Sequence, residues 1–446
     1  MRYFPNDPQT RQEMLQRIGV SRPEDLFAAI PANLQLTSLL NISAPRSEYA
    51  LLKELKAKAA SYPSELPSFL GAGVYRRFIP SAIAPIVSRA EFLTAYTPYQ
   101  PEVSQGTLQA MFEFQTMLSL LTGMEVANAS MYEGASATAE AVMMAKRVYA
   151  KGSKVLVSAG LHPEYLETLR TYLSFGDLEL VLIPLQANGQ TDLEALKAQL
   201  DETALCSVLQ RVNFYGVIED ASAHAALLEG FKALNIEVLP EMTALGLLKT
   251  PGELGVDIFV GEGQSLGLPV SYGGPNLGVF ACKAEFMRKM PGRLSGMTED
   301  SRGERAFCLT LSTREQHIRR EKATSNICSN QALMALWVTI YLSLLGKSGL
   351  RQLAQTNLTL ADYARQQMGA AGLKLRYSGA VYNEFVLELP CNAGLWVDKI
   401  QHEGLLAGVN LNRFNAEDES GLLLSFTELN SKQEIDLLVS KLKELL

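Results

Sequence analysis

Residues 256–276 read Val256-Asp257-Ile258-Phe259-Val260, then Gly261-Glu262-Gly263-Gln264-Ser265-Leu266-Gly267, and end in the glycine-rich Ser271-Tyr272-Gly273-Gly274-Pro275-Asn276. The first run is apolar, of strand length and rich in β-branched residues, which predicts a buried strand. The glycines that follow predict a tight turn. The stretch therefore predicts a strand that ends in a turn carrying the polar residues Gln264 and Ser265.

Similar apolar runs recur on both sides of this stretch and alternate with helix-like segments. The predicted strands are 154–158, 178–183, 204–209, 236–239, 257–260 and 277–281, and the predicted helices between them are 136–150, 163–172, 193–200 and 221–234. Apolar strands that alternate with helices are typical of a mostly parallel sheet covered by helices. We therefore expect an α/β fold, and ligands on such sheets bind at the carboxyl ends of the strands.

The pattern changes towards the C-terminus. Residues 329–345 read as an apolar helix, and shorter strands (384–389 and 422–426) with amphipathic helices follow it. We expect two domains. Residues 1–325 form an N-terminal helical arm and a large α/β domain, and residues 326–446 form a linking helix and a small C-terminal α+β domain.

Composition excludes several classes of function. The 446 residues carry a formal net charge of −7, which argues against nucleic acid or an anionic membrane as the main partner. The 5 cysteines are scattered and show no C-x-x-C spacing, so we expect neither a disulfide framework nor a metal site. No stretch approaches the length of an apolar membrane span, and residues 1–7 lack the apolar core of a signal peptide. We expect a cytoplasmic protein.

The order of these segments resembles the cofactor-holding half of pyridoxal phosphate (PLP) enzymes of fold type I. In that layout a lysine in the turn after the strand forms the Schiff base, and here Gln264 and Ser265 take its place. Neither side chain can form an imine. An aspartate normally faces the ring nitrogen of the cofactor, and Glu241, one methylene longer, stands at that point of this chain. We therefore expect that this half-site has lost its cofactor.

Two further segments fit the same layout. Small residues within 130–140 open a predicted helix, whose free N–H groups suit a phosphate, although they also suit tight packing. Thr324 and Asn326 match a Thr-x-Asn segment that reaches the phosphate of the neighbouring subunit's PLP in many dimeric enzymes of this kind. The alternative is that they cap a helix beginning near Ser329.

A proline-stiffened loop carries Tyr96, Tyr99 and Glu102. A tyrosine hydroxyl can donate to a substrate carboxylate, and a glutamate can act as acid or base. Composition alone favours packing for such an aromatic loop. The basic pair Arg76-Arg77 reads by default as a solvated face.

Several long motifs in order make the resemblance more specific. They are RYFP at 2–5, MLxxIG at 14–19, FLGAG at 69–73, TAYTPYQPEVSQG at 94–106, YEGASA at 132–137, VGEGQ at 260–264, YGGP at 272–275 and TREQHIRREKATSN at 313–326. Together they resemble the P-protein family of the glycine cleavage system, the decarboxylating glycine dehydrogenases. The chain is most similar to the N-terminal, or alpha, subunit of the two-subunit form.

The resemblance implies that a beta subunit carries the lysine and PLP, within an α₂β₂ assembly. The assembled enzyme decarboxylates glycine and transfers the aminomethyl group to the lipoyl arm of the H-protein. It further implies that Tyr96, Tyr99 and Glu102 have catalytic roles and that Thr324 and Asn326 bind the partner's cofactor. One alternative is a self-sufficient PLP-dependent decarboxylase or transaminase-like homodimer that uses Lys249 or Lys283, although neither position suits a Schiff base. The other is a non-catalytic scaffold subunit.

Overall fold

The computed structural model describes residues 6–36, 38, 40–62 and 66–445. Its contacts divide the chain into one unit of residues 1–64 and a second of residues 65–446.

The first unit consists of helices and connecting segments. Its elements are α1 (Pro8–Ile18), the 3₁₀ helices η1 (Pro23–Phe27) and η2 (Ala32–Leu34), and α2 (Glu48–Ala60). Among its described residues, Leu15 alone is buried, and α2 exposes Tyr49, Leu51, Leu52 and Leu55. By itself this unit therefore has almost no hydrophobic core.

The second unit is built on a seven-stranded sheet with the order β1-β7-β6-β5-β4-β2-β3. The strands are β1 (Val126–Ala127), β2 (Lys154–Ser158), β3 (Glu179–Ile183), β4 (Ala204–Gln210), β5 (Leu234–Leu239), β6 (Ile258–Glu262) and β7 (Gly278–Cys282). Strands β2 to β6 pair in parallel, and β7 runs antiparallel to both of its neighbours. The predicted mostly parallel sheet is confirmed.

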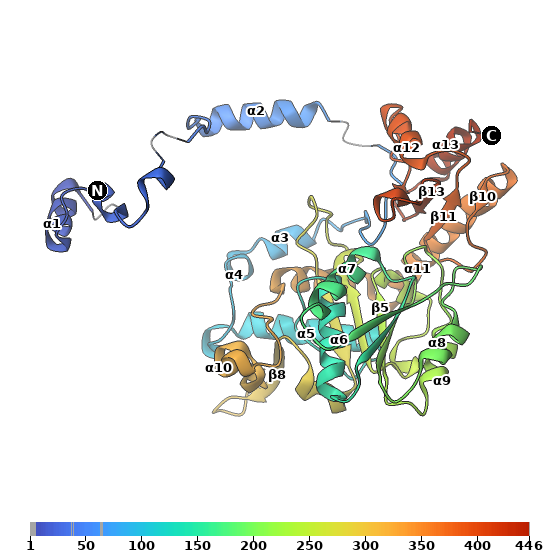
Figure 1. Ribbon diagram of the computed structural model, residues 1–446, viewed down its shortest axis with the longest axis horizontal. Coiled ribbons are helices and arrows are strands. Elements are labelled where there is room, and N and C mark those ends of the chain that lie inside the picture. The colour runs from blue at the N-terminus through green and yellow to red at the C-terminus, as the bar shows by residue number, and fades with distance from the viewer. Residues whose placement is uncertain (1–5, 37, 39, 63–65, 446) are drawn as a thin grey trace. The chain divides into compact units, whose positions relative to one another are not determined.

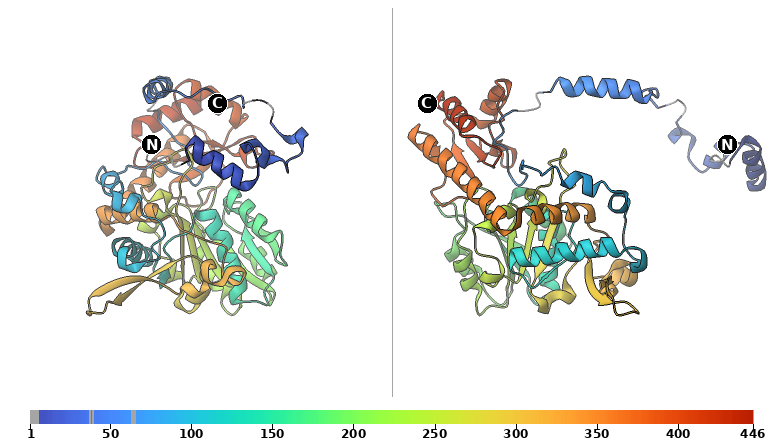
Figure 2. Two further views of the ribbon diagram at one scale, coloured as in Figure 1. Left: turned by 90° about the vertical axis from the view of Figure 1, so that its left-hand side faces the viewer. Right: turned by 180° about the vertical axis from the view of Figure 1, so that it is seen from behind.

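Helices cover both faces of this sheet (Figures 1 and 2). On one face, α6 (Gly134–Val148) and α7 (Pro163–Leu173) pack on side chains that include Ile258 and Val260. On the other, α5 (Gln105–Thr122) and the first half of α11 (Ala332–Ala370) pack on Phe259. Successive residues of β6 thus point to opposite helical layers, which explains why the strand is apolar throughout.

One predicted helix is too long. Instead of reaching residue 234, α9 (Ala221–Leu228) ends early, because Gly230 takes a left-handed conformation with φ +87° and Leu234 already begins β5. The preceding helix, α8 (Leu193–Gln199), agrees with its prediction.

A smaller antiparallel sheet follows, with the order β10-β11-β13-β12. Its elements are β10 (Lys374–Leu375), β11 (Glu384–Glu388), α12 (Ala393–His402), β12 (Val409–Asn410), β13 (Gly421–Ser425) and α13 (Lys432–Lys443). They enclose a separate core around Phe385 and Phe426, to which the second half of α11 contributes Ala361 and Met368. Helix α11 therefore joins the two cores, while a domain boundary at residue 325 stays a prediction.

The length and composition of α11 would by themselves allow it to cross a membrane, so the expectation that no stretch approaches a span was wrong. Two features of α11 indicate instead that it is a core helix of this fold. Gly346 breaks the helix with φ 59° and ψ −175°, and Val338 and Tyr341 are buried in the core of the large sheet.

The remaining elements connect these layers. They are α3 (Ile83–Val87), α4 (Ala90–Leu93), η3 (Pro101–Val103), η4 (Met242–Gly246), η5 (Gly252–Leu254), η6 (Gly263–Ser265), η7 (Ala284–Lys289), the hairpin β8 (Leu294–Glu299) and β9 (Arg305–Thr310), η8 (Ser312–Arg314), α10 (Gln316–Arg319), η9 (Arg320–Lys322) and η10 (Leu411–Arg413).

Candidate functional site

The turn after β6 carries Gln264, at the position where the resemblance to PLP enzymes led us to expect a lysine. The side chain is fully buried, and its Oε1 accepts a hydrogen bond from the backbone N–H of Tyr75 at 2.8 Å. Its Nε2 donates to the carbonyl oxygens of Tyr75 at 2.8 Å and Leu268 at 2.9 Å. The amide is thus hydrogen-bonded at both ends within the chain, and it offers no nucleophile.

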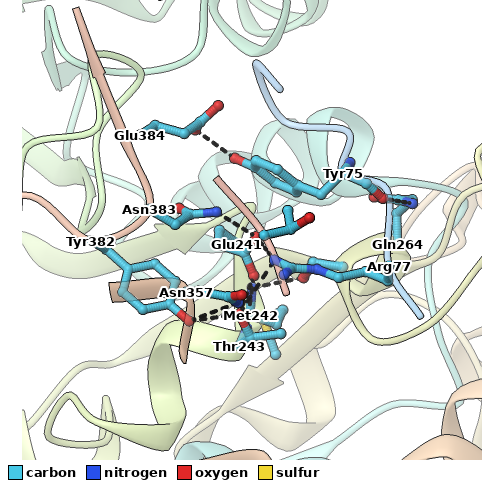
Figure 3. A network of polar contacts seen from close by, with 12 residues as sticks. Tyr75, Arg77, Glu241, Met242, Thr243, Gln264, Asn357, Tyr382, Asn383 and Glu384 are labelled. Carbon is cyan, nitrogen blue, oxygen red and sulfur yellow. Dashed lines mark hydrogen bonds and ion pairs between the residues drawn. The ribbon is translucent and has the colours of Figure 1, made fainter. Parts of the chain in front are cut away.

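The neighbouring strand β5 ends at Leu239, two residues before Glu241, the residue that we expect at the place of the aspartate that faces a pyridine nitrogen. Its carboxylate is paired with the guanidinium of Arg77 (Figure 3). The same guanidinium also binds Glu428 at 2.9 Å. Burial acts to lower the pKa of Arg77, but the carboxylates of Glu241 and Glu428 outweigh it and raise that pKa above its ordinary value. The expectation that Arg77 is a solvated surface charge was wrong, because its side chain is fully buried.

The N-terminus of α6 is also occupied by the chain itself. The carboxylate of Glu133 accepts from the backbone N–H groups of Ala135 at 2.6 Å and Ser136 at 2.9 Å. That of Glu262 accepts from Gly134 at 3.0 Å. Burial raises the pKa of Glu262 to about 7. The N–H groups that would attract a phosphate at this turn therefore already bind two carboxyl groups.

These three features test whether PLP fits this half-site. The lysine position holds an amide, the carboxylate for the ring nitrogen already has a guanidinium partner, and the anion-binding turn carries the chain's own carboxyl groups. The residues present do not fit the cofactor.

The segment that contains Ala72 and Tyr75 is also hydrogen-bonded to the smaller sheet. Tyr75 donates its hydroxyl to Glu384 of β11 at 2.8 Å (Figure 3). The N–H of Ala72 donates to the same carboxyl group at 2.8 Å. Burial raises the pKa of Glu384 to about 7. Tyr75, Arg77 and Glu384 were not predicted as site residues, because their partners lie hundreds of positions away and leave no local pattern.

His162 is another residue that the sequence did not single out. It follows β2 at the same carboxyl edge of the sheet and is buried, with Nε2 at 2.9 Å from the carbonyl oxygen of Ala72. Its ring lies 5.0 Å from that of Phe214. Burial lowers the pKa of His162, which favours the neutral ring.

The predicted catalytic loop lies on the surface. Tyr96 is 83% exposed and Tyr99 is 49% exposed, and Glu102 is an exposed residue of η3. Tyr99 makes specific contacts: its ring lies 4.9 Å from that of His317, and its hydroxyl oxygen accepts from Nη2 of Arg293 at 3.3 Å.

The Thr324–Asn326 segment is an irregular loop before α11. Thr324 is half-buried and Asn326 is exposed. The N-cap of α11 is Gln331, with no side-chain capping bond, so neither residue caps that helix. The same Arg293 that contacts Tyr99 also donates to the carbonyl of Cys328 at 2.5 Å. One arginine thus contacts both the Tyr99 loop and the loop that follows Asn326.

The alternative lysines lie elsewhere. Lys283 pairs with Asp257, which precedes β6, at the opposite edge of the sheet from Gln264. The carbonyl of Lys249 accepts from Arg211 at 2.6 Å in the segment before η5. Among the described residues, no cluster of three or more His, Cys, Asp or Glu side chains is arranged to hold a metal ion.

Distant structures share the fold. A NifS-like protein superposes with a TM-score of 0.63 at 11% identity, covering 85% of this chain and 99% of that one. A C-DES variant with glycine covalently linked to its PLP cofactor superposes with a TM-score of 0.63 at 11% identity, covering 86% of this chain and 97% of that one. At such identities the likeness establishes the fold alone, and it confirms the predicted PLP-dependent fold type I.

Nearer relatives are more specific. A crystal structure of glycine decarboxylase (P-protein), in inhibitor-bound form, superposes with a TM-score of 0.88 at 40% identity over 100% of both chains. The probable glycine dehydrogenase (decarboxylating) subunit 1 of Oceanobacillus iheyensis is 46% identical over 100% of this chain and 99% of its own. The corresponding subunit of Geobacillus kaustophilus is 47% identical over 99% and 98%. The family model described as glycine cleavage system P-protein matches residues 1–442, and this chain belongs to that family.

Proposed function

We propose that this chain is the lysine-lacking alpha subunit of a two-subunit glycine dehydrogenase (decarboxylating). Its PLP is carried by a separate beta subunit, within an α₂β₂ assembly in the cytoplasm. The relatives that match over full length are named subunit 1 of such an enzyme. The observation that carries the proposal is Gln264, an amide in the lysine position that is fully buried and hydrogen-bonded within the chain.

The assembled enzyme removes the carboxyl group of glycine and transfers the aminomethyl group to the lipoyl arm of the H-protein. PLP on the beta subunit supplies the electron sink for that chemistry. This chain supplies one wall of the partner's site: Tyr96, Tyr99 and Glu102 face the substrate, and Thr324 and Asn326 contact the cofactor phosphate. The exposure of Tyr96, Tyr99 and Asn326 in the isolated subunit leaves them free to meet a partner.

Two alternatives receive less support. A self-sufficient PLP enzyme would need a lysine near Gln264, and Lys283 is paired with Asp257 at the other edge of the sheet. A scaffold without a catalytic role would not need a tyrosine hydroxyl held by a buried arginine, as Tyr99 is by Arg293.

The experiment is to purify the chain alone and together with its beta subunit, add PLP, reduce with borohydride and map the modified peptides. We expect a stoichiometric pyridoxyl adduct in the complex, on the beta subunit alone. A stoichiometric adduct on any lysine of this chain would contradict the proposal and favour the self-sufficient enzyme. If the beta subunit alone exchanges the carboxyl group of glycine with labelled bicarbonate as fast as the complex does, the scaffold alternative is favoured.

A further inference from the structure

Arg293 occupies a position where several separate segments meet. It lies in the turn before β8 and is 5% exposed. Its Nη1 donates to Oδ1 of Asn330 at 3.1 Å, and its Nη2 donates to the carbonyl oxygen of Cys328 at 2.5 Å and to the hydroxyl oxygen of Tyr99 at 3.3 Å. The guanidinium carbon also lies 5.5 Å from the centre of the Tyr99 ring. One side chain thus joins the Tyr99 loop to the loop that follows Asn326.

The charge on Arg293 has no carboxylate partner among the described residues, and its buried Nε lacks a hydrogen-bond partner. Burying a guanidinium without a counter-ion costs stability. If Arg293 served only to stabilise the fold, an apolar side chain of similar size could take its place with little loss in the free energy of unfolding. The oxygen atoms it binds therefore point to a task of orientation.

The loop after Asn326 has other anchors. The N–H of Cys328 donates to the hydroxyl of Tyr132 at 3.0 Å, and the N–H of Gln331 donates to Oγ of Ser130 at 2.9 Å. Nδ2 of Asn330 also donates to the carbonyl oxygen of Ala129 at 2.9 Å. None of these bonds involves Arg293, so the loop keeps three attachments to the segment before α6 when the guanidinium is removed. The hydroxyl of Tyr99, by contrast, has Arg293 as its hydrogen-bond partner among the described residues.

We propose that Arg293 is a positioning residue that fixes Tyr99 relative to the Thr324–Asn326 loop. The proposal rests on the proposed function, since it assigns Arg293 to the same site wall. Because the guanidinium donates to the phenolic oxygen, the O–H of Tyr99 is free to donate to a ligand held by the partner subunit. The planar fork of arginine suits a task that requires several acceptors to be held at once.

The test is a double-mutant cycle in the assembled enzyme with Arg293→Met and Tyr99→Phe, measured by glycine–bicarbonate exchange. A misplaced catalytic group can cost about 10²-fold in rate, so we expect Arg293→Met to lower kcat by about 10²-fold with PLP still bound. If Arg293 acts through Tyr99, the double variant will be little slower than the slower single variant. Arg302→Met, which removes an exposed arginine from the same hairpin, is the matched control and should keep the wild-type rate.

The outcomes separate this inference from the proposed function. A wild-type rate for Arg293→Met, or losses that multiply in the double variant, overturns the inference even if Tyr99→Phe is slow. A wild-type rate for Tyr99→Phe removes Tyr99 from the proposed site wall, and the inference fails with it. If Arg293→Met does not assemble, Arg293→Lys decides the matter, because it keeps the charge but cannot bind three acceptors in the same geometry. Wild-type kcat in that variant overturns the inference, and a slow enzyme with unchanged KM supports it.

Discussion

Arg77 and Glu241 form a buried ion pair at the carboxyl end of β5, where a PLP enzyme of this fold directs a carboxylate at its cofactor. The relationship depends on an arginine brought in from 164 positions away in the sequence. Together with the buried amide of Gln264, it fills the half-site with the chain's own polar groups. The amide of Gln264 and the carboxylate of Glu241 thus both find their partners within the chain itself.

Restoring the lysine alone will not restore cofactor binding. We expect Gln264→Lys to give no stoichiometric pyridoxyl adduct after incubation with PLP and borohydride reduction. Arg77 still neutralises Glu241, and Glu133 and Glu262 still occupy the first turn of α6. The PLP-carrying beta subunit, treated in the same way, is the positive control. An adduct mapped to position 264 would contradict our view that the half-site excludes the cofactor.

Removing Arg77 will destabilise the chain. Arg77→Met leaves the buried carboxylate of Glu241 without its counter-ion, and breaking a buried pair in this way costs about 3–5 kcal/mol. The free energy of unfolding, measured with urea, checks the prediction. The adjacent Arg76 is exposed, and Arg76→Met is the matched control with an expected change within about 0.5 kcal/mol. Equal stability of the two variants would show that the pair makes no net contribution.

The contribution of Glu384 to the stability of the chain should fall as the pH rises from 5 to 8. Burial raises the pKa of Glu384 from its ordinary 4.5 to about 7 in the folded protein. Between these two values the unfolded chain loses the proton while the folded chain retains it, so deprotonation favours unfolding. The ionisation of Glu384 lowers the free energy of unfolding by about 3 kcal/mol at most. Glu384→Gln should therefore show a smaller fall in Tm between pH 5 and pH 8 than the wild-type chain, and equal falls would contradict the assignment.

The sequence predicted six of the seven strands of the large sheet, β2 to β7, because each is a separate apolar run with polar or glycine-rich ends. It missed β1, which is only two residues long and shows no such run. It also predicted the turn that carries Gln264, since an amide in place of a lysine is visible in a single motif. It failed for Arg77, because a pair of adjacent arginines looks the same whether one side chain is buried or both are exposed. Glu384 was missed for a related reason: its partner Ala72 lies 312 positions away, and such a contact depends on how the two sheets are placed by α11. Local patterns carry no information on that placement.

Thr324 is expected to serve the partner's cofactor. In the assembled enzyme, Thr324→Ala should weaken PLP retention by roughly 1.5–3 kcal/mol, the range for a hydrogen bond to a charged group. Its Tm should stay unchanged when PLP is saturating, because Thr324 does not cap α11. Thr356→Ala, on the exposed side of α11, is the control. Normal PLP affinity combined with a lower Tm would mean that Thr324 stabilises its own loop.

The Tyr96–Glu102 loop provides the most direct test of a catalytic contribution from this subunit. Pro98 and Pro101 restrict its backbone, so the side chains are oriented before the substrate arrives. Tyr99 is further held by Arg293 and His317, whereas Tyr96 is 83% exposed, so we expect Tyr99→Phe to be the more damaging change. Loss of a placed donor commonly costs about 10²–10³-fold in rate.

The measurement is glycine–bicarbonate exchange by the assembled enzyme carrying Tyr96→Phe, Tyr99→Phe or Glu102→Gln, with bound PLP quantified in each case. Tyr363→Phe, which removes an exposed hydroxyl paired with Asp436 far along the chain, should exchange at the wild-type rate. A slow Tyr99→Phe enzyme that retains its PLP places the loss in the chemical step and not in assembly. Wild-type exchange in all three loop variants would mean that the loop only packs, and this subunit would then have to contribute to catalysis through Thr324 and Asn326 alone.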